Sequence, residues 1–260
     1  MICAGIDAGS RMVKAVILDG VSGKILGHAV ADQGLSQVAL ARRVLRMAAA
    51  DAGMKNARGI GRIVATGYGR HNTGLRGRAV TEITCHATGA HRLVPGVRTV
   101  IDIGGQDSKV IRLAADGTVR DFVMNDRCAA GTGRFMEVVA ERCGFSLLDR
   151  KAIGKPPARP AVINCTCVVF AETEIIGLMA GGEKRGSIFS GVQNAVARRV
   201  ASAAARIIMP PVVLTGGVAL IPGMARAMSN AVGHRVRVAP LPQFAGALGA
   251  ALLAAEGDPG

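Results

Sequence analysis

The sequence is poor in aromatic side chains, which limits the partners it can bind. It has no Trp, one Tyr and only 3% aromatic residues, whereas its formal net charge is +14. Positive charge attracts nucleic acids and acidic proteins alike, but proteins that bind single strands also stack bases on aromatic rings. We therefore expect no nucleic-acid function and interpret the basic surface as one suited to polyphosphate ligands or acidic proteins.

The sequence also has no uninterrupted apolar run of membrane-spanning length. Its uncharged stretches, 207–225 and 238–255, are broken by Pro and Gly, which favours buried core over a transmembrane helix. The first residues run into a strand-like segment without the basic region or cleavage site of a signal peptide. We expect a cytoplasmic protein, in which the six cysteines are ligands, redox groups or buried apolar residues rather than disulfides.

Two common nucleotide-binding motifs are absent. The sequence contains no Gly-x-x-x-x-Gly-Lys-Ser/Thr segment, and no Gly-x-Gly-x-x-Gly segment follows a strand. Instead, an apolar strand, a small-residue turn and a second apolar strand occur in that order twice. Asp, Gly and Lys recur at identical spacing in the two copies, at positions 7, 9 and 14 and at positions 102, 104 and 109. This duplication predicts two similar β-hairpins, each with an acid beside a flexible turn.

A third apolar strand ends in glycines at Thr215, Gly216 and Gly217. Glycine lets backbone N–H groups approach phosphate closely, and an adjacent Asp can hold hydrated Mg²⁺. The three turns resemble the two phosphate elements and the adenosine element of the actin, sugar kinase and Hsp70 superfamily. The resemblance implies an α/β ATPase fold with two similar RNase H-like halves, residues 1–95 and 96–260, around a nucleotide cleft. Any one Asp-x-Gly, taken alone, could equally be a hairpin turn with a solvated acid.

Two cysteines precede segments with helical patterns. Cys128 is followed by apolar residues at helical spacing from Phe135, with Gly144 as a C-terminal stop, and Cys167 leads into another helical run. Helix N-termini favour thiolates and the negative charge of a thiolate-ligated cluster. Two thiolates cannot complete a four-thiolate site, but a twofold dimer that shares one cluster could. Buried apolar cysteines and a zinc site are the alternatives, although the sequence lacks the Cys-x-x-Cys knuckles of structural zinc.

Four segments carry a family pattern, namely 102–107, 125–134, 167–174 and 215–219. Together with 65–70 and 82–86 they resemble the activator ATPases of 2-hydroxyacyl-CoA dehydratases and the related ATPase subunits of benzoyl-CoA reductase. The resemblance implies an ATPase that couples ATP hydrolysis to low-potential one-electron reduction of a partner 2-hydroxyacyl-CoA dehydratase. It also implies a homodimer with one bridging 4Fe-4S cluster, the use of ATP and Mg²⁺, and ferredoxin or flavodoxin as the electron donor.

The turns and the resemblance together suggest roles for side chains in the cleft. We expect Asp7 and Asp102 to position metal-bound water and Gln106 to orient the attacking water. Lys14 and Lys109 would add positive charge, or would be solvated strand-end residues. The residues expected to bind the nucleotide lie in the three turns, in the first hairpin and on the approach to the helix after Cys128. They are Gly9, Ser10, Lys14, Gly104, Gly105, Gly131, Gly133, Glu137, Gly216 and Gly217.

The resemblance makes Cys128 and Cys167 the cluster ligands. The sequence departs from the family pattern at Cys165, because the pattern needs one ligand where this chain has Cys165-Thr-Cys167. Alignment on the following Val-Phe-Ala-Glu favours Cys167, while Cys165 could replace or protect it. Three other functions stay open: an ATPase subunit of a benzoyl-CoA reductase-type complex, a small-molecule kinase of the same superfamily, and a nucleotide sensor without catalysis.

Overall fold

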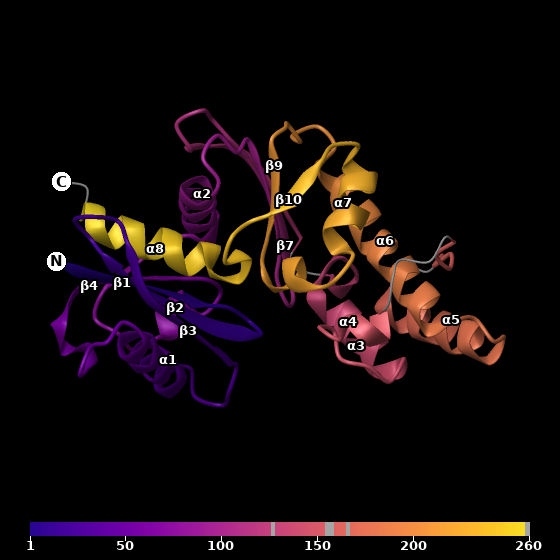
Figure 1. Ribbon diagram of the computed structural model, residues 1–260, viewed down its shortest axis with the longest axis horizontal. Helices are drawn as coiled ribbons and strands as arrows, with labels where there is room; N and C mark the ends of the chain where they lie inside the picture. The colour runs from indigo at the N-terminus through magenta and orange to yellow at the C-terminus, as the bar shows by residue number, and fades with distance from the viewer. Residues whose placement is uncertain (126–127, 154–158, 165–166, 258–260) are drawn as a thin grey trace.

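The structure, a computed structural model, describes residues 1–125, 128–153, 159–164 and 167–257. It contains two five-stranded sheets (Figure 1), with strand orders β3-β2-β1-β4-β5 and β10-β9-β6-β7-β8. The strands of the first sheet all precede residue 95, and those of the second all follow it. The strands are β1 (Ile2–Ala8), β2 (Met12–Asp19), β3 (Ile25–Asp32), β4 (Ile60–Thr66), β5 (Arg78–Ala79), β6 (Thr99–Ile103), β7 (Ser108–Leu113), β8 (Val119–Asn125), β9 (Val212–Thr215) and β10 (Val236–Val238).

The two sheets repeat one topology. Strands β1, β2 and β3 form an antiparallel meander with β4 parallel to β1, and β6, β7 and β8 form the same meander with β9 parallel to β6. All five residues of β6 are buried, as expected of a central strand that is covered on both faces. The predicted α/β fold with two similar halves is therefore confirmed.

Helices α1 (Gln37–Asp51) and α8 (Ala245–Glu256) cover opposite faces of the first sheet. Ile17 of β2 packs with α1, whereas its neighbour Leu18 packs with α8, because successive side chains of a strand point to opposite faces. Helix α1 begins where the Ser36 hydroxyl accepts a hydrogen bond from the backbone N–H of Ala39. Helix α8 comes from the C-terminal end of the chain, beyond the predicted boundary, and returns to the first sheet (Figure 1).

Helix α2 (Glu82–Leu93) joins the two halves. Its Cys85 packs with β1 and α8, and its Ala90 packs with strands of the second sheet. Helices α2 and α8 approach so closely that a Cβ at Gly249 would lie 1.8 Å from the carbonyl oxygen of Cys85. This crossing holds the two sheets on either side of one cleft.

The second sheet is covered by helices that enclose the largest apolar core, in which β6 and β9 pack against α3, α6 and α7. The predicted helix after Cys128 is confirmed as α3, and Gly144 beyond its end has a φ of +73°. Helix α5 extends from the far end of the molecule (Figure 1). The remaining helices of the described chain are α3 (Gly133–Arg142), α4 (Arg150–Ile153), α5 (Val168–Ala180), α6 (Arg185–Ala204), α7 (Met224–Val232) and the 3-10 helices η1 (Ala57–Gly59), η2 (Arg70–Asn72), η3 (Ala129–Gly131), η4 (Gly217–Leu220) and η5 (Pro242–Phe244).

Membrane crossing needs a helix that is both long and strongly apolar. None of the helices in the described part of the chain meets both requirements.

Candidate active site

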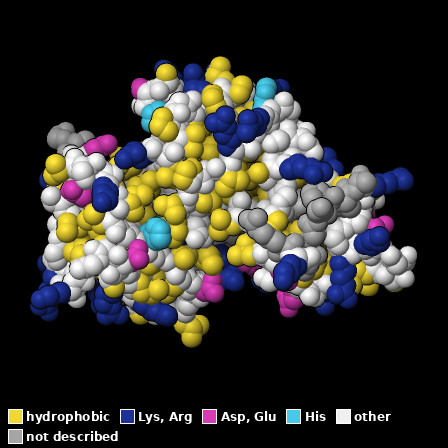
Figure 2. Space-filling view, viewed as in Figure 1, with side chains coloured by type: hydrophobic (Ala, Val, Ile, Leu, Met, Phe, Trp, Pro, Cys, Tyr) yellow, Lys and Arg dark blue, Asp and Glu magenta, His cyan; other side chains and the backbone are white. Residues whose placement is uncertain are grey.

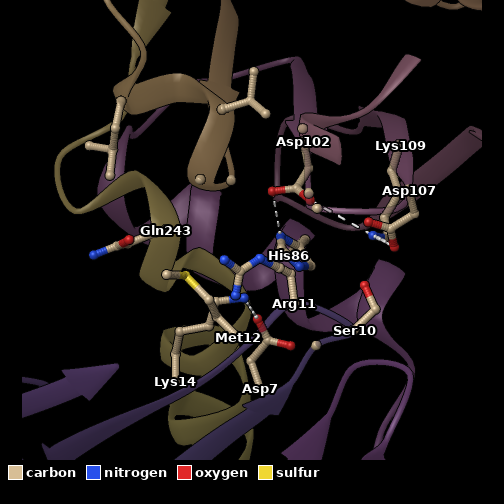
Figure 3. Close-up of a pocket in the computed structure, with 18 of the residues that line it drawn as sticks. Asp7, Ser10, Arg11, Met12, Lys14, His86, Asp102, Asp107, Lys109 and Gln243 are labelled. Carbon is tan, nitrogen blue, oxygen red and sulfur yellow. Dashed lines mark hydrogen bonds and ion pairs between the residues drawn. The ribbon is translucent and has the colours of Figure 1, made fainter. Parts of the chain in front are cut away.

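A cavity of about 190 Å³ lies where the three predicted glycine turns meet (Figure 3). Strands β1, β6 and β9 each end at this cavity, so the turns that follow them form its floor. Most of the predicted site residues line it, namely Asp7, Gly9, Ser10, Lys14, Asp102, Gly104, Gly105, Gly133, Glu137, Gly216 and Gly217.

Two predicted nucleotide-site residues are not among the described residues that line the cavity. Gln106 is exposed in the turn between the lining residues Gly105 and Asp107. Gly131 is buried in η3, where a Cβ would lie 3.4 Å from the amide nitrogen of Asn125. Gly131 therefore shapes the approach to α3, and its assignment to the nucleotide stays a prediction.

The two hairpins place a lysine directly opposite each aspartate. Asp7 pairs with Lys14 across β1 and β2, and Asp102 pairs with Lys109 across β6 and β7. In the first hairpin the Lys14 ammonium lies 3.1 Å from the Asp7 carboxylate. The identical Asp-to-Lys spacing seen in the sequence is thus the spacing that brings acid and base together across a tight antiparallel turn.

The second lysine is surrounded by carboxylates. The Lys109 ammonium, only 2% exposed, lies 2.5 Å from Asp107, 3.2 Å from Glu82 and 3.8 Å from Asp102. Burial alone would lower the pKa of Lys109, but these carboxylates outweigh it, so its pKa is raised above the ordinary value. Lys109 is therefore held as a buried cation.

Asp102 is the acidic centre of this network. Its carboxylate lies 3.1 Å from His86 Nδ1 and accepts a 2.8 Å hydrogen bond from the Thr215 hydroxyl. Burial would raise the pKa of Asp102, but His86 and Lys109 outweigh it and hold the pKa well below the ordinary value. Burial lowers the pKa of His86 in turn, and the Asp102 carboxylate more than reverses this, leaving the His86 pKa raised.

Sequence reasoning assigned no role to several side chains of the cavity, among them His86, Glu82 and Arg11. His86 and Glu82 lie in the segment 82–86 that carried part of the family pattern, yet only the fold shows that α2 brings them to Asp102 and Lys109. Arg11, beside the predicted Ser10, also lines the cavity. The position of Arg11 in the first turn was the signal that could have identified it.

Glycine is required where the turns approach other parts of the chain closely. Gly216 has a φ of +85°, and a Cβ there would lie 2.3 Å from the carbonyl oxygen of Ile103. A Cβ at Gly105 would lie 2.5 Å from the Cβ of Arg11. No side chain fits at either point, and at Gly105 the turns of the two halves meet directly. Glycine at such turns lets the backbone approach a phosphate closely.

Helix α3 is hydrogen-bonded to the second turn. The N–H of Gly133 donates to the carbonyl oxygen of Gly104 at 2.9 Å, and the N–H of Arg134 donates to that of Gly105 at 2.8 Å. The segment that precedes α3 contains Cys128. Movement of the second turn would therefore be transmitted directly to the cysteine segment.

The two predicted cluster cysteines both precede helices, as expected. Cys128 is half-buried and occupies the N-cap position of η3. Its carbonyl oxygen accepts a 2.9 Å hydrogen bond from the Asn125 side chain. Cys167 is exposed and stands at the N-cap of α5. Neither thiol makes a capping hydrogen bond. Cys165 lies outside the described residues.

The other described cysteines, Cys3, Cys85 and Cys143, are buried. Burial raises the pKa of each of these thiols, to about 11 for Cys85. They fit the core role expected for them.

Comparison with known proteins identifies the family. Residues 4–254 match the BadF/BadG/BcrA/BcrD ATPase family. The chain is a member of this ATPase family. Over 261 residues it is 44% identical to the activator of lactoyl-CoA dehydratase of Anaerotignum propionicum, a match that covers 98% of each protein.

Solved structures agree with this membership. The activator of the 2-hydroxyisocaproyl-CoA dehydratase from Clostridium difficile with bound ADPNP superposes on this ATPase with a TM-score of 0.92 at 38% identity, covering 98% of this chain and 95% of its own. A ROK family glucokinase from Streptomyces griseus, in complex with glucose and AMPPNP, covers 99% of this chain and 100% of its own with a TM-score of 0.58 at 16% identity. The second likeness shows the fold alone, which is the sugar kinase-like fold expected from the sequence.

Proposed function

We propose that this family member is an ATP-dependent electron-transfer activator that works as a homodimer. In this proposal, ATP hydrolysis in the cavity drives low-potential one-electron reduction of a partner 2-hydroxyacyl-CoA dehydratase. The observation that carries the proposal is the pair of backbone hydrogen bonds from α3 to Gly104 and Gly105. They connect the predicted phosphate-binding turn to the segment that contains Cys128, so one short element serves both functions.

The nucleotide is proposed to lie along the three turns. Its phosphates would face Gly9 and Ser10 on one side and Gly104 and Gly105 on the other, and its nucleoside would lie near Gly216 and Gly217. Backbone N–H groups and the buried Lys109 would neutralise phosphate charge. Such a transfer needs positioning and electrostatic stabilisation more than covalent help from the protein.

The buried acids fit a hydrated magnesium ion. Asp7 and Asp102 are 5% and 2% exposed and both line the cavity, and carboxylate oxygens are ligands that Mg²⁺ prefers. These two residues would hold the metal-bound water. Gln106, exposed beside the lining residue Gly105, is proposed to orient the attacking water. His86 would keep Asp102 ionised and correctly placed.

Two observations favour a shared iron-sulfur cluster. Cys128 and Cys167 are both accessible thiols at the starts of helices, where N–H groups stabilise anionic sulfur. Cys128 and Cys167 would supply two thiolates from one chain, so a four-thiolate site would need a second chain. Cys128 and Cys167 of each subunit would hold one 4Fe-4S cluster, which would supply a single low-potential electron.

The resemblance to dehydratase activators also suggests the proposed partners. Ferredoxin or flavodoxin would be the donor, and the dehydratase component the acceptor. The 44% identical relative is a dehydratase activator, which favours the dehydratase over a benzoyl-CoA reductase-type complex. Activity with a benzoyl-CoA reductase component and none with a dehydratase would reverse that choice.

The test is the iron and acid-labile sulfide content of protein purified without oxygen, together with its mass in solution. We expect a dimer with about two iron atoms per chain. Cys128→Ser and Cys167→Ser should each lose the iron, while Cys143→Ala, which removes a buried thiol, should retain it. A chain that hydrolyses ATP but binds no iron after anaerobic reconstitution would overturn the electron-transfer function and favour a kinase.

A further inference from the structure

Arg11 bridges the two halves of the molecule across the cavity. It lies in the turn between β1 and β2, and its Nε is 3.0 Å from Glu137 Oε1 on α3. Its terminal nitrogen is also 3.2 Å from Asp32 of the first sheet. Arg11 and Glu137 both line the cavity, so a side chain of the first phosphate turn is paired with the helix that follows Cys128.

The backbone and Cβ of Arg11 are held in place by close contacts, whereas its side chain is partly exposed to solvent. Its carbonyl oxygen accepts a 3.0 Å hydrogen bond from the N–H of Gln33, and its Cβ fits against Gly105 only because that residue has no side chain. The Arg11 and Glu137 side chains are 43% and 25% exposed. Ion pairs at this exposure are weak, so the guanidinium can change partners at small cost.

Glu137 has a second cationic partner on its own helix. Arg134, one turn earlier, lies 3.1 Å from Glu137 Oε2. If Arg11 left Glu137, the carboxylate would therefore still be paired. Only the contact between the two halves of the molecule would be lost, because Arg134 belongs to the same helix as Glu137.

We propose that Arg11 is a positioning residue that exchanges Glu137 for the terminal phosphate of a bound nucleoside triphosphate, and so releases α3 when ATP binds. A guanidinium can bind phosphate oxygens with two parallel hydrogen bonds, whereas Arg11 makes a single hydrogen bond to Glu137 and another to Asp32. ADP lacks the terminal phosphate that would compete with Glu137 for Arg11. The change of partner therefore distinguishes ATP from ADP. The inference rests on the proposed ATPase site and adds to it a sensor that connects the nucleotide to the Cys128 segment.

The first test measures nucleotide affinity in the full-length protein purified without oxygen. Titration calorimetry with ADPNP and with ADP should show that Arg11→Met weakens ADPNP binding about tenfold, which is about 1.4 kcal/mol, and changes ADP binding less than twofold. In this proposal Glu137 competes with the nucleotide for Arg11 and does not itself bind the nucleotide, unlike the expectation from the sequence. Glu137→Gln should therefore bind ADPNP two to five times more tightly. Equal weakening of both nucleotides in Arg11→Met, or weaker ADPNP binding in Glu137→Gln, would overturn the proposal.

The second test follows α3 itself by hydrogen exchange of peptides that cover residues 129–142. In the wild-type protein, ADPNP but not ADP should speed exchange there at least threefold, because α3 loses its contact with the first half. In Glu137→Gln exchange should be fast with either nucleotide or with none. Arg134→Gln is the matched control, because it removes a partner of Glu137 without crossing the cleft, and it should behave as the wild type does.

The two tests separate this inference from the proposed function. If the wild-type protein hydrolyses ATP and contains iron while the hydrogen exchange of α3 is the same with and without nucleotide, only the proposed change of partner by Arg11 is wrong. If the wild-type protein neither binds ADPNP nor hydrolyses ATP, the proposed ATPase site is wrong as well. Should Arg11→Met fail to fold, the Glu137→Gln and Arg134→Gln pair still decides the question.

Discussion

At the scale of single residues, the cavity is organised around a buried carboxylate with two basic partners. Asp102 is 2% exposed and faces His86 at 3.1 Å and Lys109 at 3.8 Å. An ionised group at this depth is tolerated only when it is paired and hydrogen-bonded. The same pairing keeps Asp102 ionised, as its proposed role beside a metal-bound water requires.

Replacing Asp102 should therefore cost both stability and activity. Asp102→Asn removes the carboxylate that His86 and Lys109 share, although Asp107 and Glu82 still pair with Lys109. Removal of one partner of a buried ion pair costs about 3–5 kcal/mol. Urea unfolding should show this loss, and ATP hydrolysis should fall by about 10² or more. Thr215→Val, which removes only one hydrogen bond to Asp102, should cost about 1 kcal/mol. An Asp102→Asn protein as stable as Thr215→Val would contradict the role of the charge.

Gln106 provides a second prediction at this scale. If its side chain orients the attacking water, Gln106→Ala should lower the rate of ATP hydrolysis about tenfold or more and leave ADPNP affinity unchanged, because Gln106 is exposed beside the cavity. Single-turnover hydrolysis and calorimetry measure the two quantities separately. A normal hydrolysis rate would remove Gln106 from the mechanism.

The cysteines should differ sharply in reactivity. The pKa of Cys85 is raised to about 11, so at pH 8 only about one thiol in a thousand would be the reactive thiolate, and Cys3 and Cys143 are likewise buried with raised pKa values. Iodoacetamide labelling of the metal-free chain, followed by peptide mass spectrometry, should modify exposed Cys167 first and half-buried Cys128 next. Labelling of Cys85 at the rate of Cys167 would show that the core around α2 opens.

At the scale of helices and strands, the crossing of α2 and α8 depends on glycine. A Cβ at Gly89 would lie 1.9 Å from the carbonyl oxygen of Ala245, whereas a Cβ at Gly177 on α5 meets nothing within 4 Å. Both positions are helical, so the two substitutions share the same gain in helix propensity and differ in the space available.

Gly89→Ala should destabilise the protein, because the clash is with backbone and the two helices must separate. Overpacking of this kind costs about 1–3 kcal/mol or more. Gly177→Ala should be neutral or stabilise by up to about 1 kcal/mol, because it only reduces the backbone entropy of the unfolded chain. Urea denaturation of both variants tests the comparison, and equal effects would show that the α2 and α8 crossing is not tightly packed.

The hairpins could be predicted from the sequence, whereas the crossing of α2 and α8 could not. The hairpins were predictable because Asp7 and Lys14, like Asp102 and Lys109, are close along the chain and their spacing sets the register. The contribution of His86 was not predictable, because it depends on how small residues let α2 approach α8. The return of α8 to the first sheet and the Arg11 contact with α3 join residues far apart in sequence, and no local periodicity records such contacts.

At the scale of the whole molecule, the net charge is +14, and on the face shown in Figure 2 basic side chains are scattered over the surface and outnumber the acidic ones. One basic group lies close to the cysteine segments. Arg198 and Arg199 of α6 line a hollow together with Asn125, near Cys128, and Asn164, near Cys167. An acidic electron-transfer protein that docks here would meet complementary charge beside the proposed cluster.

Salt should therefore slow electron transfer without slowing ATP hydrolysis. Complementary surface charge raises the rate of protein encounter and is screened over about 10 Å at 0.1 M salt, whereas the charges of Asp102 and Lys109 are buried. Reduction of the partner should fall about tenfold between 50 and 500 mM salt, while basal ATPase activity changes less than twofold. Arg198→Gln should reproduce part of this loss at low salt, and Arg42→Gln, on α1 of the other half, should not. If salt reduced both activities equally, the basic surface would be acting on the nucleotide site and not on docking.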